Sequence, residues 1–259
     1  MRRWLAVLGL VWCSYTHSEG APTMAQIDLA FASQHSGALA DQISFEMSVS
    51  NANKVVEQLA KWHRLTVAKI DDKSLLVSMP EQPVSSDKVV ARHSSETFVI
   101  DLSEASTQDF TSGFKNGETS FELVEIAEYV RGYITDSTYV HDFNIASRVA
   151  TQRSGDCTEH AVLSTALARS LGLPARVMVG AVIMETQEET AAFGHAWSEV
   201  WRDDRWHIVD SALYGSEAKK HFYLPTAELT KETTGYSWAL INTTSMLPHK
   251  ISNLQNLKL

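Results

Sequence analysis

One run of predicted secondary structure near the middle of the chain constrains the fold more than any other feature. Residues 158–171 carry apolar side chains at helical spacing, and Gly172 ends the predicted helix. The run 175–184, which is apolar apart from Arg176, strongly predicts a strand, and two more strands are predicted at 196–201 and 205–210. A helix followed by three strands predicts an α+β fold in which helices pack on an antiparallel sheet.

The remainder of the chain divides into regions of different character. Residues 103–118 are rich in Ser, Thr, Asp, Gly and Asn and predict a loop or linker, so we place a domain boundary after residue 112. The expected regions are a signal peptide at 1–20, a small mixed α/β region at 21–112, and a main domain at 113–259. Further predicted elements are strands at 43–49, 66–70, 75–79, 88–91 and 97–102, helices from Asn51 or Asn53 to Leu65 and from Ser120 to Ile134, and a loop at 185–192.

The amino terminus has the pattern of a secretory signal peptide. Two positive charges, Arg2 and Arg3, precede about ten apolar residues, a run too short to span a bilayer as a helix. Small residues favour cleavage after Gly20, and the alternatives are a lipoprotein leader modified at Cys13 or a buried amino-terminal helix. We therefore expect an exported protein, periplasmic or secreted, without a membrane span once the signal is removed.

Charge and cysteine content exclude several classes of protein. The chain has 22 Lys and Arg against 31 Asp and Glu, a net charge of −9, and it lacks a basic stripe, which argues against a nucleic-acid partner. Its two cysteines, Cys13 and Cys157, are too few for a disulfide framework or a four-cysteine zinc site. Signal cleavage would leave Cys157 as an unpaired thiol.

Cys157 is placed at the start of the predicted helix. A helix amino terminus exposes unpaired backbone N–H groups and a partial positive charge, which favour thiolate over thiol and can stabilise an oxyanion. This position predicts a reactive nucleophile with a lowered pKa. The alternative is an inert, buried small residue, because free cysteine is among the most buried residue types.

His195 and Asp210 are candidates for the base and its orienting acid. If Asp203 and Asp204 form a two-residue hairpin turn, Arg202 faces Arg205, and His195 lies diagonally from Asp210 on one face of the sheet. That spacing allows the carboxylate to orient the imidazole. A three-residue turn would put the two on opposite faces, and the alternatives are a core histidine and a strand-end cap.

Three sequence blocks resemble one family. GDCTEHAVLSTALARSLGLPARVMVG, GHAWSEVW and RWHIVD are similar to the transglutaminase-like superfamily of papain-type thiol enzymes, and most similar to its exported bacterial members. The resemblance covers residues 149–213 and implies a transglutaminase-like (papain-like) core with a Cys157–His195–Asp210 catalytic triad. The chain departs from the family pattern after the aspartate, where Ser211 and Ala212 replace a typical Pro-Thr pair. The residues up to 112 resemble no family.

The resemblance implies cysteine-dependent acyl transfer or amide hydrolysis on a protein or peptide substrate, without a cofactor or metal. Gln152 could add an oxyanion donor, Trp197 could wall the site, and His160, which follows the nucleophile by three residues, could tune the thiolate or serve only in packing. A catalytically silent binding module is the alternative function. A metal site at Cys157, His160 and His195 is disfavoured because a fourth ligand is missing. The sequence leaves the oligomeric state open.

Overall fold

A computed structural model describes residues 26–114, 120–137 and 143–257 of the chain. The predicted signal peptide and Cys13 lie outside the described residues. Within the described ranges, no helix has the length and apolar character needed to cross a bilayer.

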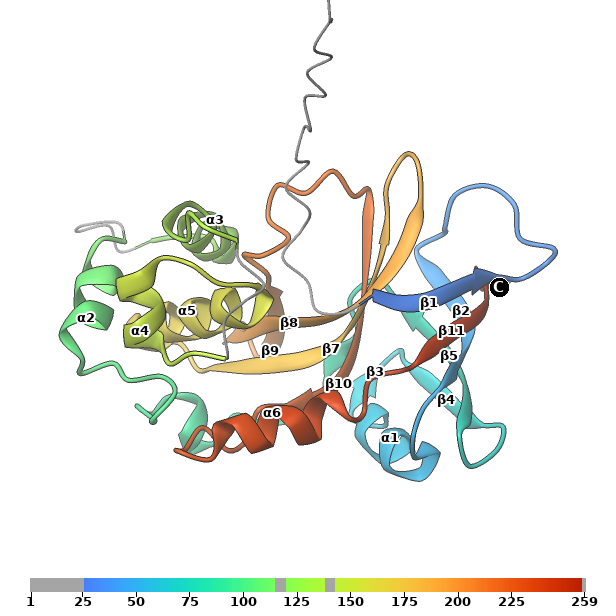
Figure 1. The fold of residues 1–259 in the computed structure, drawn as a ribbon, viewed down its shortest axis with the longest axis horizontal. Coiled ribbons are helices and arrows are strands. Elements are labelled where there is room, and N and C mark those ends of the chain that lie inside the picture. The colour runs from blue at the N-terminus through green and yellow to red at the C-terminus, as the bar shows by residue number, and fades with distance from the viewer. Residues whose placement is uncertain (1–25, 115–119, 138–142, 258–259) are drawn as a thin grey trace, which may run out of the picture.

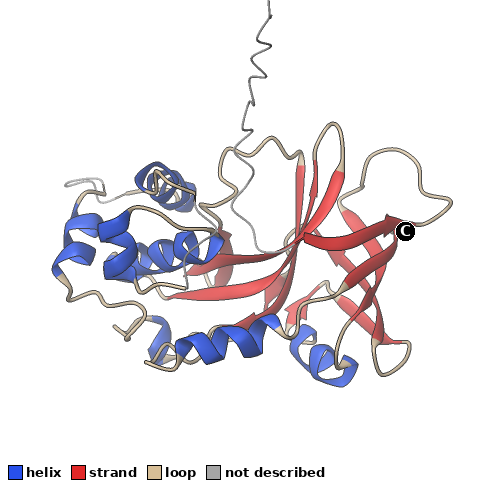
Figure 2. Ribbon diagram, viewed as in Figure 1, coloured by secondary structure: helices blue, strands red, loops and turns tan. Residues whose placement is uncertain are grey.

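A curled, mostly antiparallel sheet runs through the molecule (Figures 1 and 2). Its strand order is β10-β7-β8-β1-β11-β2-β5-β4, with β9 also paired to β8. Among the strands of the described ranges, only β1 and β11 pair in parallel. A separate two-stranded sheet joins β3 to β6. The strands are β1 (Gln26–Phe31), β2 (Gln42–Ser48), β3 (Trp62–His63), β4 (Thr66–Lys69), β5 (Ser74–Pro80), β6 (Val84–Ser85), β7 (Ala175–Glu185), β8 (Thr190–Arg202), β9 (Arg205–Val209), β10 (Lys220–Glu228) and β11 (Lys250–Asn256).

Helices gather mainly at one end of this sheet, where they cover β7, β8 and β9 (Figure 1). They are α2 (Ala105–Ser112), α3 (Leu123–Tyr133), α4 (Ala146–Gln152) and α5 (Cys157–Ser170), while α1 (Ala52–Leu59) and α6 (Tyr236–Thr244) lie along the other side. Every residue of α5 from Cys157 to Arg169 is buried, because α5 packs between the sheet and the other helices. The α+β prediction is confirmed.

The carboxy-terminal strand joins the amino-terminal strands. β11 lies between β1 and β2, pairing Ile251 with Leu29 on one side and with Met47 on the other. The sheet therefore continues without a break from the helical end to the amino-terminal strands.

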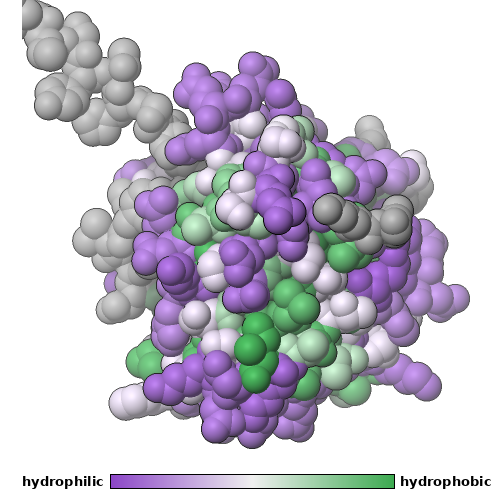
Figure 3. All heavy atoms as spheres, turned by 90° about the vertical axis from the view of Figure 1, so that its right-hand side faces the viewer, coloured by the Kyte–Doolittle hydropathy of each residue, from purple (hydrophilic) through white to green (hydrophobic). Residues whose placement is uncertain are grey.

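The surface at the end of the molecule formed by the amino-terminal strands shows hydrophobic residues among hydrophilic ones (Figure 3). Large hydrophobic side chains that are exposed in the molecule include Phe31 and Leu76. The domain boundary after residue 112 stays a prediction.

Several local predictions hold and others are wrong. Asn51 caps α1, its Oδ1 accepting the N–H of Lys54 at 3.1 Å, but the helix ends at Leu59 because the next residues form β3. The predicted loop at 103–118 contains α2, whose only buried side chains are Thr107 and Phe110, a pattern too weak to detect in sequence.

Three other boundaries differ from the sequence-based expectation. Residues 88–91 and 97–102 form no strand: the carbonyl of Val99 instead accepts the N–H of Ala146 at the start of α4. The α3 helix begins at Leu123 with Glu122 as its N-cap, rather than at Ser120. The β7–β8 hairpin extends through the predicted loop at 185–192, leaving only residues 186–189 as its turn.

Candidate active site

Cys157 is the first residue of α5, and the residues around it fix the helix start. Asp156 is the N-cap and accepts the N–H of Thr158 at 2.9 Å, while Glu159 accepts the N–H of Asp156 at 3.0 Å, forming a reciprocal capping box. Gly155 lies against Glu159 so closely that a Cβ there would be 2.3 Å from the Glu159 Cβ. The sequence Gly-Asp-Cys-Thr-Glu thus determines locally where the thiol is placed.

The Cys157 thiol is fully buried, and its pKa is raised well above the usual value. Burial is the largest cause, and the carboxylates of Asp156, Asp210 and Glu159 act in the same direction; the backbone N–H of Ala196 acts in the opposite one. The expected lowering of the thiol pKa by the helix terminus is therefore wrong for this arrangement. Burial among carboxylates outweighs the partial positive charge of the helix end.

The β8–β9 hairpin has the register that the sequence predicts. Arg202 pairs with Arg205 and Ser198 pairs with Val209, so Trp197 lies in the row of Asp210, which follows the end of β9. Asp203 and Asp204 make the two-residue turn, with φ of 51° and 58°. Positive φ at both turn positions is the geometry that matches the twist of paired strands.

This register brings His195 and Asp210 into contact. Nε2 of His195 lies 2.7 Å from Oδ2 of Asp210, and both side chains are buried. The other ring nitrogen of His195, Nδ1, is buried and has no hydrogen-bond partner among the described residues. The second Asp210 oxygen, Oδ1, accepts the N–H groups of Ala212 and Leu213 at 3.0 and 3.1 Å. Asp210 is thereby fixed from both sides.

Burial raises the pKa of Asp210, but the charge and hydrogen bond of His195, with the donors Tyr223 and Leu213, lower it overall. The same carboxylate acts on the thiol of Cys157, so Asp210 lies within electrostatic reach of both the cysteine and the histidine. The arrangement can hold a histidine in one tautomer beside a buried thiol.

Tyr223 on β10 is a member of this site that the sequence analysis missed. Its hydroxyl donates to Oδ2 of Asp210 at 2.9 Å, and its ring lies 6.4 Å from that of His195 and 5.2 Å from that of Trp197. Burial and the neighbouring carboxylate raise the Tyr223 pKa well above 10, so the phenol keeps its proton. No sequence signal marks this residue, because β10 reaches the site only through its pairing with β7.

Residues 105–211 match the core of the transglutaminase-like superfamily. This region of the chain belongs to the transglutaminase-like superfamily. No curated protein sequence matches it significantly.

Solved structures also match the chain. A proposed cysteine protease from Cytophaga hutchinsonii is 13% identical over 73% of this chain and 77% of its own, with a TM-score of 0.46. The periplasmic domain of TgpA from Pseudomonas aeruginosa is 15% identical over 71% and 75%, with a TM-score of 0.42. Red sea bream transglutaminase is 11% identical over 68% and 46%, with a TM-score of 0.30.

His160 and Ser211 connect α5 to the end of β9 in this transglutaminase-like protein. Nδ1 of His160 lies 3.1 Å from the Ser211 hydroxyl, which also contacts Ser164 at 3.0 Å. Burial, followed by the charge of Arg131, lowers the pKa of His160 to about 3, so its ring is neutral. Its Nε2 is buried without a partner. Ser211, at the departure from the family pattern, therefore has a structural partner on the helix that begins with Cys157.

Of the two remaining residues predicted for the site of the transglutaminase-like domain, Trp197 lies beside His195 and Gln152 is exposed. Trp197 is buried beside His195, with ring centroids 6.1 Å apart, and Gly180 on β7 leaves room for its indole. Gln152 is the exposed last residue of α4, and its side chain makes no hydrogen bond with any described residue. Among the described residues, no three His, Cys, Asp or Glu side chains form a candidate metal site.

Proposed function

We propose that this protein is a thiol-dependent enzyme that transfers or hydrolyses acyl groups of a protein or peptide substrate. Cys157 is the nucleophile, His195 is the base, and Asp210 orients His195. The observation that carries this proposal is the asymmetry of the His195 ring. Nε2 is held by Asp210 at 2.7 Å, whereas Nδ1 is buried without a partner and is free to exchange a proton.

In this mechanism Sγ of Cys157 attacks the carbonyl carbon of an amide while its proton passes to Nδ1 of His195. The negative charge on the carbonyl oxygen is stabilised by backbone N–H groups at the start of α5. The C–N bond then breaks, and His195 returns the proton to the leaving amine. Because burial raises the thiol pKa, the resting cysteine is a neutral thiol that is deprotonated as it attacks.

The acyl-enzyme is released to water, which gives hydrolysis, or to an amine, which gives a crosslink. We favour water as the acceptor. A denatured protein as substrate distinguishes the reactions. Release of ammonia without amine incorporation indicates deamidation, new amino termini indicate proteolysis, and incorporation of an added amine indicates crosslinking. The same measurement on Cys157→Ala subtracts any contaminating activity.

One observation favours the alternative of a catalytically silent binding module. The Cys157 side chain is fully buried, so a substrate reaches it only after neighbouring groups move. A silent module and an enzyme differ in whether His195 assists the thiol, and alkylation of the thiol measures that assistance without knowledge of the substrate.

The test is the rate of iodoacetamide alkylation of Cys157, located by peptide mass spectrometry, in the wild-type protein and in His195→Ala. Around neutral pH we expect the variant to react at about one tenth of the wild-type rate or more slowly still, because the base is lost. His207→Ala is the matched control, since its ring contacts the carbonyl of Arg202 and lies outside the triad. Equal rates in all three proteins would reject the enzymatic proposal and favour the silent module.

We also propose that the protein is exported and acts in the cell envelope, because of the charged and apolar leader at residues 1–13. Mass spectrometry of the protein isolated from a bacterial periplasm should give a chain that begins at Ala21. A chain that retains residue 1, or that carries a lipid on Cys13, contradicts cleavage after Gly20.

A further inference from the structure

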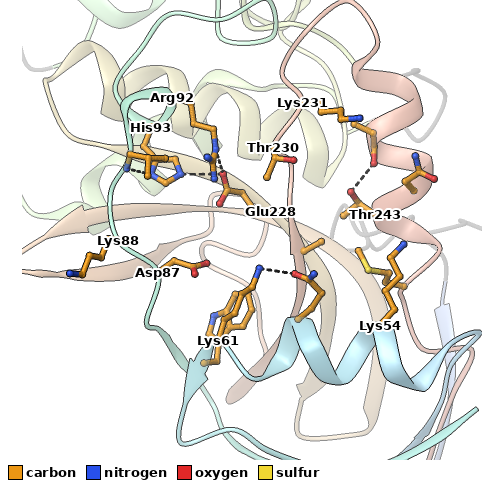
Figure 4. Close-up of a pocket in the computed structure, with 17 residues that line it drawn as sticks. Lys54, Lys61, Asp87, Lys88, Arg92, His93, Glu228, Thr230, Lys231 and Thr243 are labelled. Atoms are coloured by element: carbon orange, nitrogen blue, oxygen red, sulfur yellow. Dashed lines mark hydrogen bonds and ion pairs between the residues drawn. The ribbon is translucent and has the colours of Figure 1, made fainter. Parts of the chain in front are cut away.

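A cavity lies away from the triad, between α1, the segment after β6, the end of β10 and α6 (Figure 4). Its volume is about 740 Å³, which is in the range of pockets that hold small ligands. None of Cys157, His195 and Asp210 lines it. The inference drawn from this cavity does not depend on the proposed function.

The cavity concentrates positive charge in an acidic protein. Five basic side chains line it, namely Lys54, Lys61, Lys88, Arg92 and Lys231, against two carboxylates, Asp87 and Glu228. In the whole chain the balance is reversed, with 22 basic and 31 acidic residues. Figure 4 shows the basic side chains approaching the cavity from several elements: Lys54 from α1, Arg92 from the opposite wall and Lys231 from beyond β10.

The two carboxylates make ion pairs with arginines. Glu228 accepts from Arg92 at 2.8 Å, from His93 at 3.1 Å and from the buried Arg176 at 3.2 Å, and Asp87 lies 3.3 Å from the same Arg176. These partners hold the pKa of Glu228 down at about 2, although burial alone would raise it. Among the described residues, neither carboxylate forms an ion pair with a lysine of the cavity.

The lysines have no such partners. Within the part of the chain that the structure describes, Lys54, Lys61, Lys88 and Lys231 form no ion pair, and Lys61 donates only to the neutral amide of Gln58 at 3.0 Å. Trp62, which also lines the cavity, has a buried indole N–H without an acceptor. Unpaired cations and an unsatisfied donor together call for an acceptor that carries negative charge.

We propose that this cavity binds a small ligand bearing at least two anionic groups, phosphate or carboxylate, held by the lysines of α1 and of the segment after β10. The lysine side chains extend from separate elements around the cavity, so a ligand with two anionic groups can be held from two sides. A ligand with two or more such groups contacts Lys54 on α1 and Lys231 after β10 at the same time. Neutral ligands of the same size lack the charges that these side chains require.

The test is isothermal titration calorimetry of the full mature protein with pyrophosphate and with citrate, which separate phosphate from carboxylate recognition. We expect saturable one-to-one binding of at least one of them, weakening as salt is raised. Lys54→Gln/Lys231→Gln removes two exposed charges and should weaken binding about tenfold. Binding by Cys157→Ala should equal that of the wild type, because the cavity is separate from the triad.

The matched control is Lys73→Gln/Lys250→Gln, which removes the same charge from exposed residues outside the cavity. We expect this control to bind like the wild type. Absence of saturation by both probes in the millimolar range, or an equal loss of binding in the two double variants, would overturn the inference. The first outcome shows that no anion site exists, and the second that binding follows net charge alone.

Discussion

Tyr223 donates its hydroxyl hydrogen to Oδ2 of Asp210 at 2.9 Å, the same oxygen that lies 2.7 Å from the His195 ring. Asp210 thus receives donors from β8, from β10 and from the turn that follows it. A carboxylate that accepts this many hydrogen bonds keeps both its charge and its orientation. Tyr223 is therefore a positioning residue of the proposed triad.

Removal of this hydroxyl should change the pH dependence of the thiol. In Tyr223→Phe, loss of the donor raises the Asp210 pKa. When the alkylation rate of Cys157 is plotted against pH, the fall in rate on the acid side (the acid limb) should therefore move to higher pH. The rate near neutral pH should fall about tenfold, since hydrogen bonds to charged groups contribute about 1.5–3 kcal/mol. Tyr133→Phe, which removes a hydroxyl bonded to the Ala150 carbonyl at 2.8 Å, is the control. An unchanged acid limb in Tyr223→Phe rejects the positioning role.

Glu159 should make the stability of the protein depend on pH. Burial, followed by the charge of Asp156, raises its pKa to about 7. The folded state then binds a proton more tightly than the unfolded state, so this contribution is complete below about pH 4.3 and is lost as pH rises through 7. Relative to Glu159→Gln, the wild type should lose up to about 3 kcal/mol over this interval. Urea denaturation across pH measures the difference, and parallel curves would contradict it.

Arg176 should be a large contributor to stability. Its guanidinium is buried, lies 2.6 Å from Glu199, and packs 4.2 Å from the ring of Trp206. Arg176→Met should destabilise the fold by about 3–5 kcal/mol, because a buried Glu199 is left without its partner. Adding Glu199→Gln should recover part of the loss.

The control for that prediction is Arg92→Met, since the Arg92 side chain is 42% exposed and its partner Glu228 keeps Arg176 as a second partner. We expect a change within about 1 kcal/mol. Urea denaturation of the three variants measures these differences. Similar losses in Arg92→Met and Arg176→Met would show that burial of the pair has no special effect.

Gly180 should tolerate no side chain. A Cβ at this position would lie 2.1 Å from the Leu224 carbonyl oxygen and 2.7 Å from the Trp197 ring. Gly180→Ala should therefore destabilise the protein by about 2–3 kcal/mol and displace Trp197 from His195. Gly132→Ala on α3 has open space around it and should be neutral or stabilise by up to about 1 kcal/mol. Thermal unfolding of both variants checks the opposite signs.

Local sequence was sufficient to predict the parts of the site that lie within one element or one hairpin. The capping residues Asp156 and Glu159 begin α5 at Cys157, and the Asp203–Asp204 turn sets the register that joins His195 to Asp210. Each depends on interactions between residues a few positions apart. Such interactions leave a pattern in the sequence itself.

Only the tertiary structure decided the features that depend on distant segments. Tyr223 reaches Asp210 because β10 pairs with β7, and β11 enters the sheet between two amino-terminal strands. The raised thiol pKa of Cys157 also required the structure, since it depends on burial and on surrounding carboxylates rather than on the helix terminus. Pairing of distant strands and desolvation arise from the packed whole, so no local pattern records them.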